Sequence, residues 1–221
     1  MKVPLPQSNK GRGLASWVTE SLREAILQGH FDPGEKLDQN RLASELNVSR
    51  TPIREALKVL ESEGFIEIHS YRGAFIAKVS QQDINNVYEI RRLLEVEVAR
   101  QVPLIIPDAT IAELERLLTA DQQAFDNGEN AKHFEYDSIF HDTFMKYTHN
   151  MLVREVLDNL NNRVIRVRYF ALNQPGEHLR ESLKEHWDIL QGLKKRDPDL
   201  TAEKMRVHLT NSAARIKELL L

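Results

Sequence analysis

Four acidic and histidine side chains occupy helical faces that are otherwise apolar. Asp137 and His141 are four residues apart, so one turn of helix places both on the same face. His186 and His208 each lie on the apolar stripe of a further helical segment. Carboxylate oxygens and imidazole nitrogens are metal ligands, and burying them is costly unless something binds them. The pattern predicts that Asp137, His141, His186 and His208 converge on one metal ion.

A single inward histidine is more often a satisfied core residue, whereas four such groups on three helices favour a shared site. One aspartate oxygen and three histidine nitrogens suit a divalent transition metal. This set of ligands does not discriminate among Zn²⁺, Ni²⁺, Mn²⁺ and Fe²⁺. Octahedral coordination would leave two positions open for another ligand. Three other histidines lack an inward placement, and we expect them on the surface: His133, His149 and His178.

Arg91 and Glu95 lie within the apolar stripe of the helix predicted to begin at Ser80. Their spacing allows an ion pair between neighbouring turns, which would lower the cost of burying both charges. A second interpretation adds a ligand, because the planar guanidinium of Arg91 suits a carboxylate. Arg91 is therefore our candidate residue for binding a small carboxylate effector, and simple pairing with Glu95 is the alternative.

Arginines gather at the start of the helix that Ser49 is expected to cap. Arg50 projects from its first turn, and Arg54 lies opposite its apolar stripe. Arginine can donate two hydrogen bonds to guanine in the major groove, and helix N-terminal amides suit a phosphate. Taken singly, each arginine could equally be an ordinary solvated side chain. The predicted DNA-contacting residues are Arg41, Ser49, Arg50, Thr51, Arg54, Arg72 and Gly73.

The elements that carry these arginines form a recognisable order. A helix from Leu14 to a cap at Gly29 precedes a short helix that begins at Asp38, and the helix from Ser49 follows after one turn. Residues 65–69 and 74–79 alternate as two strands, with residues 71–73 at the tip of the hairpin. We therefore expect a winged helix-turn-helix domain with a small β-hairpin wing over residues 14–79, preceded by a flexible arm at 1–13.

The rest of the chain, residues 80–221, is predicted to be entirely helical. Pro103 and Pro107 interrupt the periodicity after the first of these helices. The fold class is thus mainly α, with the winged domain followed by an antiparallel helical bundle that binds metal and effector and dimerises. The expected helices cover residues 80–102, 110–127, 131–149, 151–173, 177–195 and 201–220.

Composition narrows the class of protein. The 221 residues include no cysteine, which excludes disulfides, a thiol nucleophile and cysteine-ligated metal. No apolar run approaches the length of a membrane span, and the N-terminus lacks the apolar core of a secretory signal, so the expected location is the cytoplasm, away from membranes. Residues 1–80 carry 11 Lys and Arg against 10 Asp and Glu, so DNA binding would rest on placed arginines rather than bulk charge.

The N-terminal motifs resemble the DNA-binding domain of the GntR family of bacterial transcription regulators. The run from Val48 to Leu57 follows the family signature nearly residue for residue, and the segments at 37–43 and 60–66 also match. The resemblance implies contacts with operator DNA by Arg41, Arg50, Arg54 and Gly73. Arg72 corresponds to a more variable position of the wing.

The helical part resembles the FCD ligand-binding domain of the fatty-acid-regulator (FadR-type) subfamily. The matching pairs are Arg91 with Glu95 and Asp137 with His141, together with His186 and His208. The resemblance implies that these last four are the ligands found in metal-binding members. About six helices indicate the shorter, vanillate-regulator-like (VanR-like) branch. His149-Asn150-Met151 departs from the usual Gly-Asn-Pro turn.

These features together predict a homodimer that binds double-stranded operator DNA as an inverted repeat. A metal-bound small organic acid would change its affinity for the operator. One alternative is a metal-dependent hydrolase that uses an open site of three histidines and one aspartate, although no inward general base is evident and an enzyme would not need the winged domain. Another is a regulator whose metal is purely structural or is itself the signal.

Overall fold

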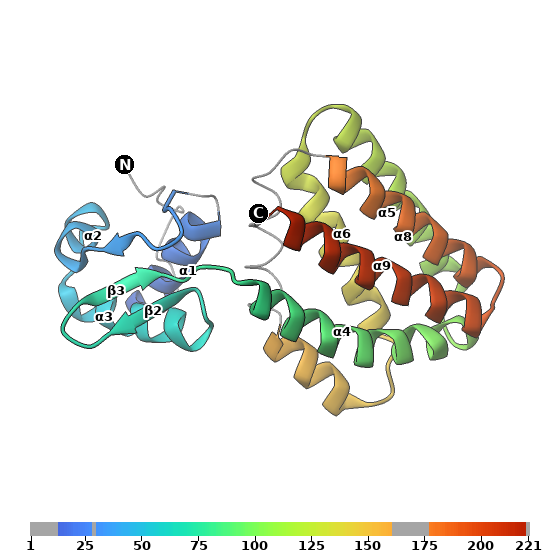
Figure 1. The fold of residues 1–221 in the computed structure, drawn as a ribbon, viewed down its shortest axis with the longest axis horizontal. Coiled ribbons are helices and arrows are strands. Elements are labelled where there is room, and N and C mark those ends of the chain that lie inside the picture. Colours follow the sequence, from blue (N-terminus) through green and yellow to red (C-terminus); the bar gives the residue numbers. More distant parts are fainter. Residues whose placement is uncertain (1–12, 28–29, 161–176, 220–221) are drawn as a thin grey trace. The chain divides into compact units, whose positions relative to one another are not determined.

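A computed structural model describes residues 13–27, 30–160 and 177–219 of the chain. The described residues form two compact units, and the chain passes from one to the other between Val79 and Ser80 (Figure 1). Within the described ranges, no helix has both the length and the apolar character needed to span a membrane. Residues 1–12 of the arm predicted at 1–13 lie outside these ranges, as does the predicted cap at Gly29.

The first unit is a winged helix-turn-helix, as predicted. Its three-stranded antiparallel sheet has the order β1-β3-β2, with Ile66 paired to Ile76 and His69 to Gly73. The short strand β1 was not predicted, because two residues are too few to show an alternating pattern. The elements are α1 (Leu14–Leu27), β1 (Lys36–Leu37), α2 (Gln39–Glu45), α3 (Arg50–Ser62), β2 (Ile66–His69) and β3 (Gly73–Ile76).

Local chemistry explains the bend between α2 and α3. The Asp38 carboxylate accepts hydrogen bonds from the backbone amides of Asn40 and Arg41, which begins α2 as expected. Asn47 adopts a left-handed conformation with φ of 53°, which ends the turn. Ser49 occupies the N-cap of α3 but its side chain makes no capping hydrogen bond, so the first amides of α3 are left for other partners.

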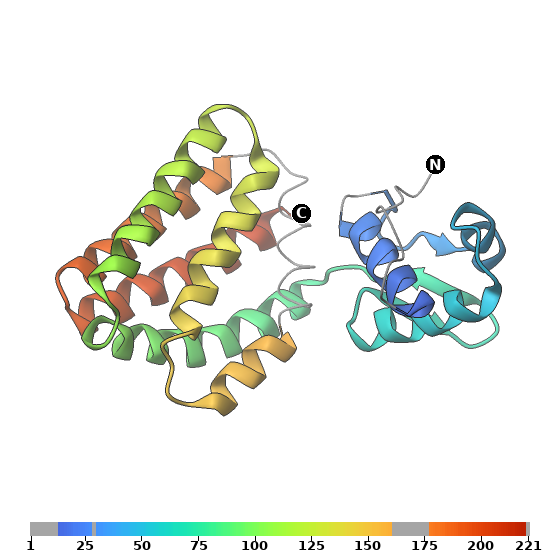
Figure 2. The same ribbon diagram turned by 180° about the vertical axis from the view of Figure 1, so that it is seen from behind.

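The second unit is entirely helical over its described residues (Figures 1 and 2). A capping box between Ser80 and Asp83 begins the first helix, and α9 packs against both α4 and α8. Residues 151–160 are helical, while the remainder of the helix expected at 151–173 lies outside the described residues. The other elements are α4 (Gln81–Gln101), η1 (Val102–Leu104), α5 (Asp108–Asp126), α6 (Asn130–Met145), α8 (Glu177–Lys194) and α9 (Pro198–Glu218).

A close contact brings α8 and α9 together near the turn that joins them. A Cβ atom added at Gly192 would lie 2.9 Å from the Cα of Thr201, a fully buried residue of α9. Thr201 also donates its hydroxyl hydrogen to the backbone carbonyl of Asp197, at 2.7 Å. The absence of a side chain at Gly192 therefore sets the approach of the two helices that carry His186 and His208.

Candidate nucleic-acid interface and metal centre

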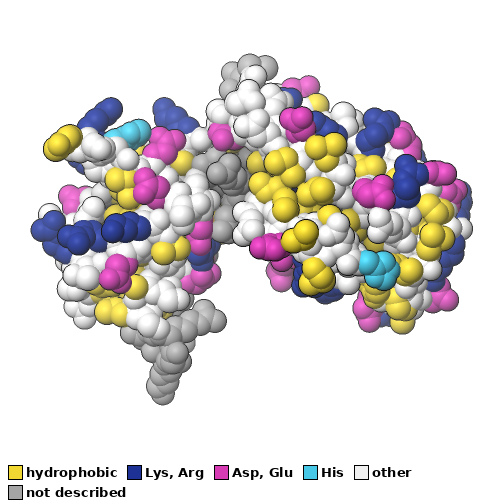
Figure 3. Space-filling model, turned by 90° about the horizontal axis from the view of Figure 1, so that it is seen from below, with side chains coloured by type: hydrophobic (Ala, Val, Ile, Leu, Met, Phe, Trp, Pro, Cys, Tyr) yellow, Lys and Arg dark blue, Asp and Glu magenta, His cyan; other side chains and the backbone are white. Residues whose placement is uncertain are grey.

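The first turns of α3 present the predicted DNA-contacting residues to solvent. Ser49, Arg50, Thr51 and Arg54 are all exposed. The opposite face of α3 is buried, with Leu57 and neighbouring apolar residues in the core of the unit. Lysine and arginine side chains extend from the surface of this unit among acidic and apolar ones (Figure 3). The helix thus has the exposed cationic face that entry into a major groove requires.

Arg41 and the hairpin tip supply further cations. The Arg41 side chain is 47% exposed, and its Nε lies 3.3 Å from Glu45 Oε1, a surface pair that DNA phosphates could replace. Arg72 lies in the turn between β2 and β3, with its guanidinium carbon 5.7 Å from the centre of the Phe75 ring. Gly73 has φ of 102°, a conformation that favours glycine. Contact of these residues with DNA stays a prediction.

The four predicted metal ligands meet inside the helical unit. Asp137 and His141 come from α6, His186 from α8 and His208 from α9. All four are buried, and each offers one ligand atom within 4.8 Å of the others. His141 Nε2 lies 3.2 Å from His208 Nε2, and Asp137 Oδ1 lies 3.3 Å from His186 Nε2 and 3.8 Å from His141 Nε2. The structure brings the residues together, and their service as ligands stays a prediction.

Carboxylates orient two of these imidazoles from outside the cluster. Glu95 Oε2 accepts a hydrogen bond from His141 Nδ1 at 2.7 Å, and Glu185 Oε2 accepts one from His208 Nδ1 at 3.0 Å. Because an ionised carboxylate only accepts, each Nδ1 carries the proton, and the lone pair of each Nε2 faces the cluster. This is the arrangement that orients histidine ligands in metal sites.

An arginine in turn holds each of these carboxylates. Arg91 Nε donates to Glu95 Oε1 at 2.5 Å, and Arg215 donates to both oxygens of Glu185 at 2.8 and 2.7 Å. Burial raises the pKa of Glu185, but its bonds to Arg215 and His208 more than offset this and lower the pKa to about 2. The site therefore contains two parallel chains, Arg91–Glu95–His141 and Arg215–Glu185–His208. The pairing of Arg91 with Glu95 is as the spacing predicted, whereas no role at the site was predicted for Glu185 or Arg215.

His186 is the least satisfied member of the cluster. It is 0% exposed, and neither ring nitrogen forms a hydrogen bond with any described residue. Its ring stacks on Phe140, with the ring centres 4.5 Å apart, so packing holds the imidazole in place. Leaving buried polar atoms without partners costs about 1–3 kcal/mol each. A cation at the cluster would satisfy Nε2, so the residues present fit a metal ion.

The electrostatics also favour a cation. Burial lowers the pKa of His186 well below its ordinary value and lowers the pKa of His141 to about 4, despite the nearby Glu95. Burial likewise lowers the pKa of His208, although Glu185 opposes the shift. The imidazoles are thus neutral at pH 7, which is the form that binds metal. Facing lone pairs on His141 and His208 repel each other unless a cation or proton lies between them.

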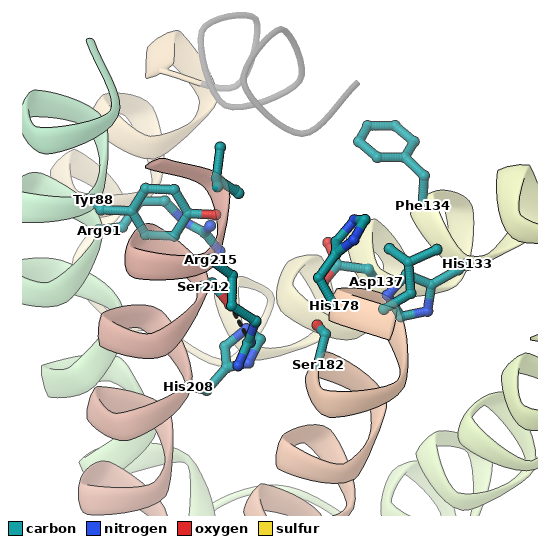
Figure 4. A pocket seen from close by; sticks show the side chains of 12 residues that line it. Tyr88, Arg91, His133, Phe134, Asp137, His178, Ser182, His208, Ser212 and Arg215 are labelled. Atoms are coloured by element: carbon teal, nitrogen blue, oxygen red, sulfur yellow. Dashed lines mark hydrogen bonds between the residues drawn. The ribbon is translucent and has the colours of Figure 1, made fainter. Parts of the chain in front are cut away.

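An open cavity adjoins the cluster (Figure 4). Arg91, itself only 2% exposed, lies on the wall formed by α4 and α9, and its guanidinium carbon is 5.0 Å from the centre of the Tyr88 ring. Ser182 and His178 of α8 lie on the opposite wall together with residues of α6. Asp137 and His208 connect the cavity to the cluster.

Two sequence predictions at this site are wrong, and both concern histidines that we expected on the surface. His133, expected on the surface, is 4% exposed and its Nδ1 lies 2.9 Å from each carboxylate oxygen of the fully buried Asp121. His178 is half-buried and lines the cavity, which also departs from the expectation, whereas His149 is exposed as predicted. The spacing of four residues between His133 and Asp137 was the signal that could have placed His133 on the inward face.

The architecture defines a class of protein: a winged helix-turn-helix joined to a helical domain with an internal cavity, as in regulators that bind DNA. The chain matches the gntR family of bacterial regulatory proteins over residues 14–76 and the FCD domain over residues 86–211. It belongs to the GntR family, in the group that carries an FCD domain. It is therefore a DNA-binding transcription regulator rather than an enzyme, and the hydrolase alternative has no support.

Curated relatives are similar along nearly the whole chain. The chain is 30% identical to the HTH-type transcriptional repressor RspR of Escherichia coli K12, over 96% of this chain and 93% of that protein. It is 30% identical to the uncharacterised regulator YdhC of Bacillus subtilis, covering 90% and 89%. The gluconate operon transcriptional repressor of Bacillus subtilis is 27% identical, covering 92% and 85%.

Solved structures share the fold. McbR/YncC of Escherichia coli superposes with a TM-score of 0.77 at 21% identity, covering 95% of this chain and 100% of that one. A GntR regulator from Rhodococcus sp. RHA1 gives a TM-score of 0.76 at 22% identity, covering 91% and 96%. The observed fold is thus one that other GntR regulators adopt.

Proposed function

We propose that this regulator is a homodimer whose affinity for operator DNA is set by a small organic acid bound beside a divalent transition metal. Asp137, His141, His186 and His208 would hold the metal, and Arg91 would bind the acid. The observation that carries the proposal is the buried cluster of neutral imidazoles next to a cavity lined by an arginine. The two functions would divide at the unit boundary, with DNA binding in residues 14–79 and ligand binding and dimerisation in 80–221.

The donor set supports a metal from the first transition series. Three nitrogens and one carboxylate oxygen suit Zn²⁺, Ni²⁺, Mn²⁺ and Fe²⁺. When bound, such an ion would supply Lewis acidity and open coordination positions for a carboxylate oxygen. Glu95 would keep Nε2 of His141 directed at the ion, and Glu185 would do the same for His208. Neither ring would have to rotate when the metal binds.

Arg91 would link the acid to the helix that begins the domain. Its guanidinium already pairs with Glu95, so an incoming carboxylate would share or replace that partner. Glu95 also accepts a hydrogen bond from His141, so a shift of Arg91 that moves Glu95 would also move this proposed metal ligand. Because α4 begins directly after the boundary at Val79, a displacement of α4 would carry the effect of ligand binding to the DNA-binding unit.

Dimerisation would place two α3 helices on successive major grooves of an inverted repeat. Arg50 and Arg54 would contact bases, and Arg72 with Gly73 would approach the minor groove. A groove between α4 and α9 suits a second copy of the chain, because it combines an exposed Leu93 (69%) with charges of both signs, Glu89 and Arg206. A two-fold axis can pair such opposite charges with each other.

The relatives indicate further properties. Two of the curated proteins are named as repressors, which supports repression for this chain. A cytoplasmic location fits a DNA-binding regulator, and the helix number fits the VanR-like branch.

The deciding experiment is a thermal-shift screen of small organic acids with and without a chelator, followed by gel-shift titration with operator DNA. Stabilisation by an acid that requires metal and changes DNA affinity is the expected result. A response to metal alone would instead favour the sensed-metal alternative, and metal-dependent stability with no effect on DNA binding would favour a structural metal.

A further inference from the structure

Tyr71 lies at the tip of the wing, in the turn between β2 and β3 (Figure 1). Its exposed fraction is 108%, whereas no other large hydrophobic side chain among the described residues exceeds 71%. The ring is thus presented to solvent and contributes almost no packing to the core of the unit. Single exposed apolar side chains are common on protein surfaces, so exposure by itself assigns no role to this residue.

The backbone of Tyr71 adds a second observation. The amide of Arg72 donates a hydrogen bond to the carbonyl oxygen of His69 at 3.1 Å, which closes a four-residue turn with Tyr71 at its third position. Tyr71 has φ of 63° there, a left-handed conformation that glycine and asparagine adopt at lower cost than tyrosine. Tyr71 therefore stabilises the wing neither by packing nor by its backbone conformation, and residues held in such conformations concentrate at functional sites.

Two cations lie beside the tip. The guanidinium carbon of Arg72 lies 5.7 Å from the centre of the Phe75 ring, and Nζ of Lys36 lies 6.0 Å from the same centre. Lys36 comes from β1, and its Cε would lie 3.4 Å from a Cβ atom added at Gly73, the residue that begins β3. Both cations are exposed. The projecting ring is thus accompanied by positive charges, which suits a groove whose two edges are rows of phosphates.

We infer that Tyr71 is a specificity-determining residue that recognises A·T pairs in the minor groove of the operator. The minor groove of B-form DNA is about 6 Å wide, which admits a flat ring edge-on. At an A·T pair the floor of the groove presents only acceptors, adenine N3 and thymine O2, to which the phenolic hydroxyl can donate. At a G·C pair the amino group of guanine projects from the floor and would collide with the ring. Lys36 and Arg72 would bind the neighbouring phosphates.

This inference rests on the proposed approach of the wing to the minor groove, and its test uses a chemical change confined to that groove. The probe is a duplex that wild-type full-length protein selects from a randomised library. Each A·T pair of this duplex is replaced in turn by G·C and by inosine·C. Inosine·C presents the major groove of G·C but lacks the guanine amino group, so its minor groove resembles that of A·T. A pair that G·C disrupts and inosine·C restores is therefore recognised in the minor groove, whereas inosine·C does not restore a pair that α3 contacts.

The quantity measured at each minor-groove pair is the ratio of the dissociation constants for the G·C and A·T duplexes. Wild type should show at least one such pair in each half-site, with a ratio of about five or more that inosine·C returns to within about twofold of A·T. Tyr71→Phe removes only the hydroxyl group, and it should weaken binding to the A·T duplex and lower the ratio. Tyr71→Asn has a side chain too short to reach the floor of the groove, and its ratio should fall close to one.

Two controls separate recognition of DNA from folding of the wing. Tyr71→Asn should melt at or above the temperature of wild type, because asparagine adopts the left-handed conformation more readily. It should also keep the wild-type affinity differences at the pairs that α3 contacts. Ser70→Ala removes a hydroxyl group from the exposed neighbour in the same turn, and it should keep the wild-type ratio.

The outcomes distinguish the inference from the proposal on which it rests. An unchanged ratio in Tyr71→Asn, or the absence in wild type of any pair that inosine·C restores, would overturn the role of Tyr71. If Arg72→Ala weakens binding to the selected duplex while Tyr71→Asn keeps the wild-type ratio, the proposed approach of the wing stands and only the inference fails. If neither variant changes any dissociation constant, the proposed approach fails as well. A ratio that falls in Tyr71→Asn but not in Ser70→Ala supports the assignment.

Discussion

Replacing His186 by leucine tests the metal centre, because we expect the variant to be more stable than wild type without metal and less stable than wild type with metal. Leucine has a volume close to that of histidine but no polar atoms, so it would remove two buried nitrogens that lack hydrogen bonds in the structure. Each such group costs about 1–3 kcal/mol, and the change of shape against Phe140 costs about 1–2 kcal/mol. The two nitrogens together cost about 2–6 kcal/mol, so we expect metal-free His186→Leu to be more stable than metal-free wild type, by about 2–3 kcal/mol at the middle of these ranges.

The order should reverse when metal is present. A metal at about 100 times its dissociation constant stabilises the folded state by about 2.7 kcal/mol, and loss of a ligand removes most of that gain. For a protein of this size, each kcal/mol shifts the melting temperature by about 2–4 °C. Chelation should thus lower the melting temperature of wild type by roughly 5–11 °C and leave that of His186→Leu nearly unchanged.

Differential scanning calorimetry with zinc and with chelator, together with elemental analysis, measures both effects. His149→Leu, at an exposed histidine, is the control and should respond to chelation as wild type does. Full metal occupancy in His186→Leu would refute the ligand assignment. A metal-free variant that melts well below metal-free wild type would refute the argument that the imidazole is unsatisfied without its ion.

Four further outcomes are expected. Arg91→Ala should retain zinc but lose acid binding, and unchanged acid affinity in calorimetric titration would contradict its role. Arg54→Ala should weaken operator binding by about 1–3 kcal/mol with little change in folding, and equal binding in a salt-matched gel shift would remove it from the base contacts. Gly192→Ala should destabilise the helical unit by about 1–3 kcal/mol, because the new Cβ would lie 2.9 Å from the Thr201 backbone. An unchanged midpoint of urea unfolding would show instead that α8 and α9 can move apart without a loss of stability. Leu93→Asp should yield monomers in sedimentation, whereas an intact dimer would place the interface elsewhere.

Features set by neighbouring residues were predictable from the sequence. The caps at Asp38 and at Ser80 with Asp83 lie within one turn of the amides they bind, so the pattern of residue types identifies them directly. Helical periodicity likewise placed Asp137 and His141 on one inward face, because residues four apart are neighbours on any helix. The winged helix-turn-helix and the all-helical second unit follow from the same local rules.

Contacts between helices were decided only by the tertiary structure. The bond from Glu185 to His208 and the pair formed by Asp121 and His133 each join two different helices. Whether such side chains meet depends on the rotation and longitudinal offset of packed helices, which the spacing of residues along one helix does not specify. The spacing of four residues from Asp137 could have placed His133 on the inward face, but its pairing with Asp121 on another helix could not be read from that spacing. The sequence by itself determined that Asp137, His141, His186 and His208 face inward, and packing of the helices decided which side chains meet.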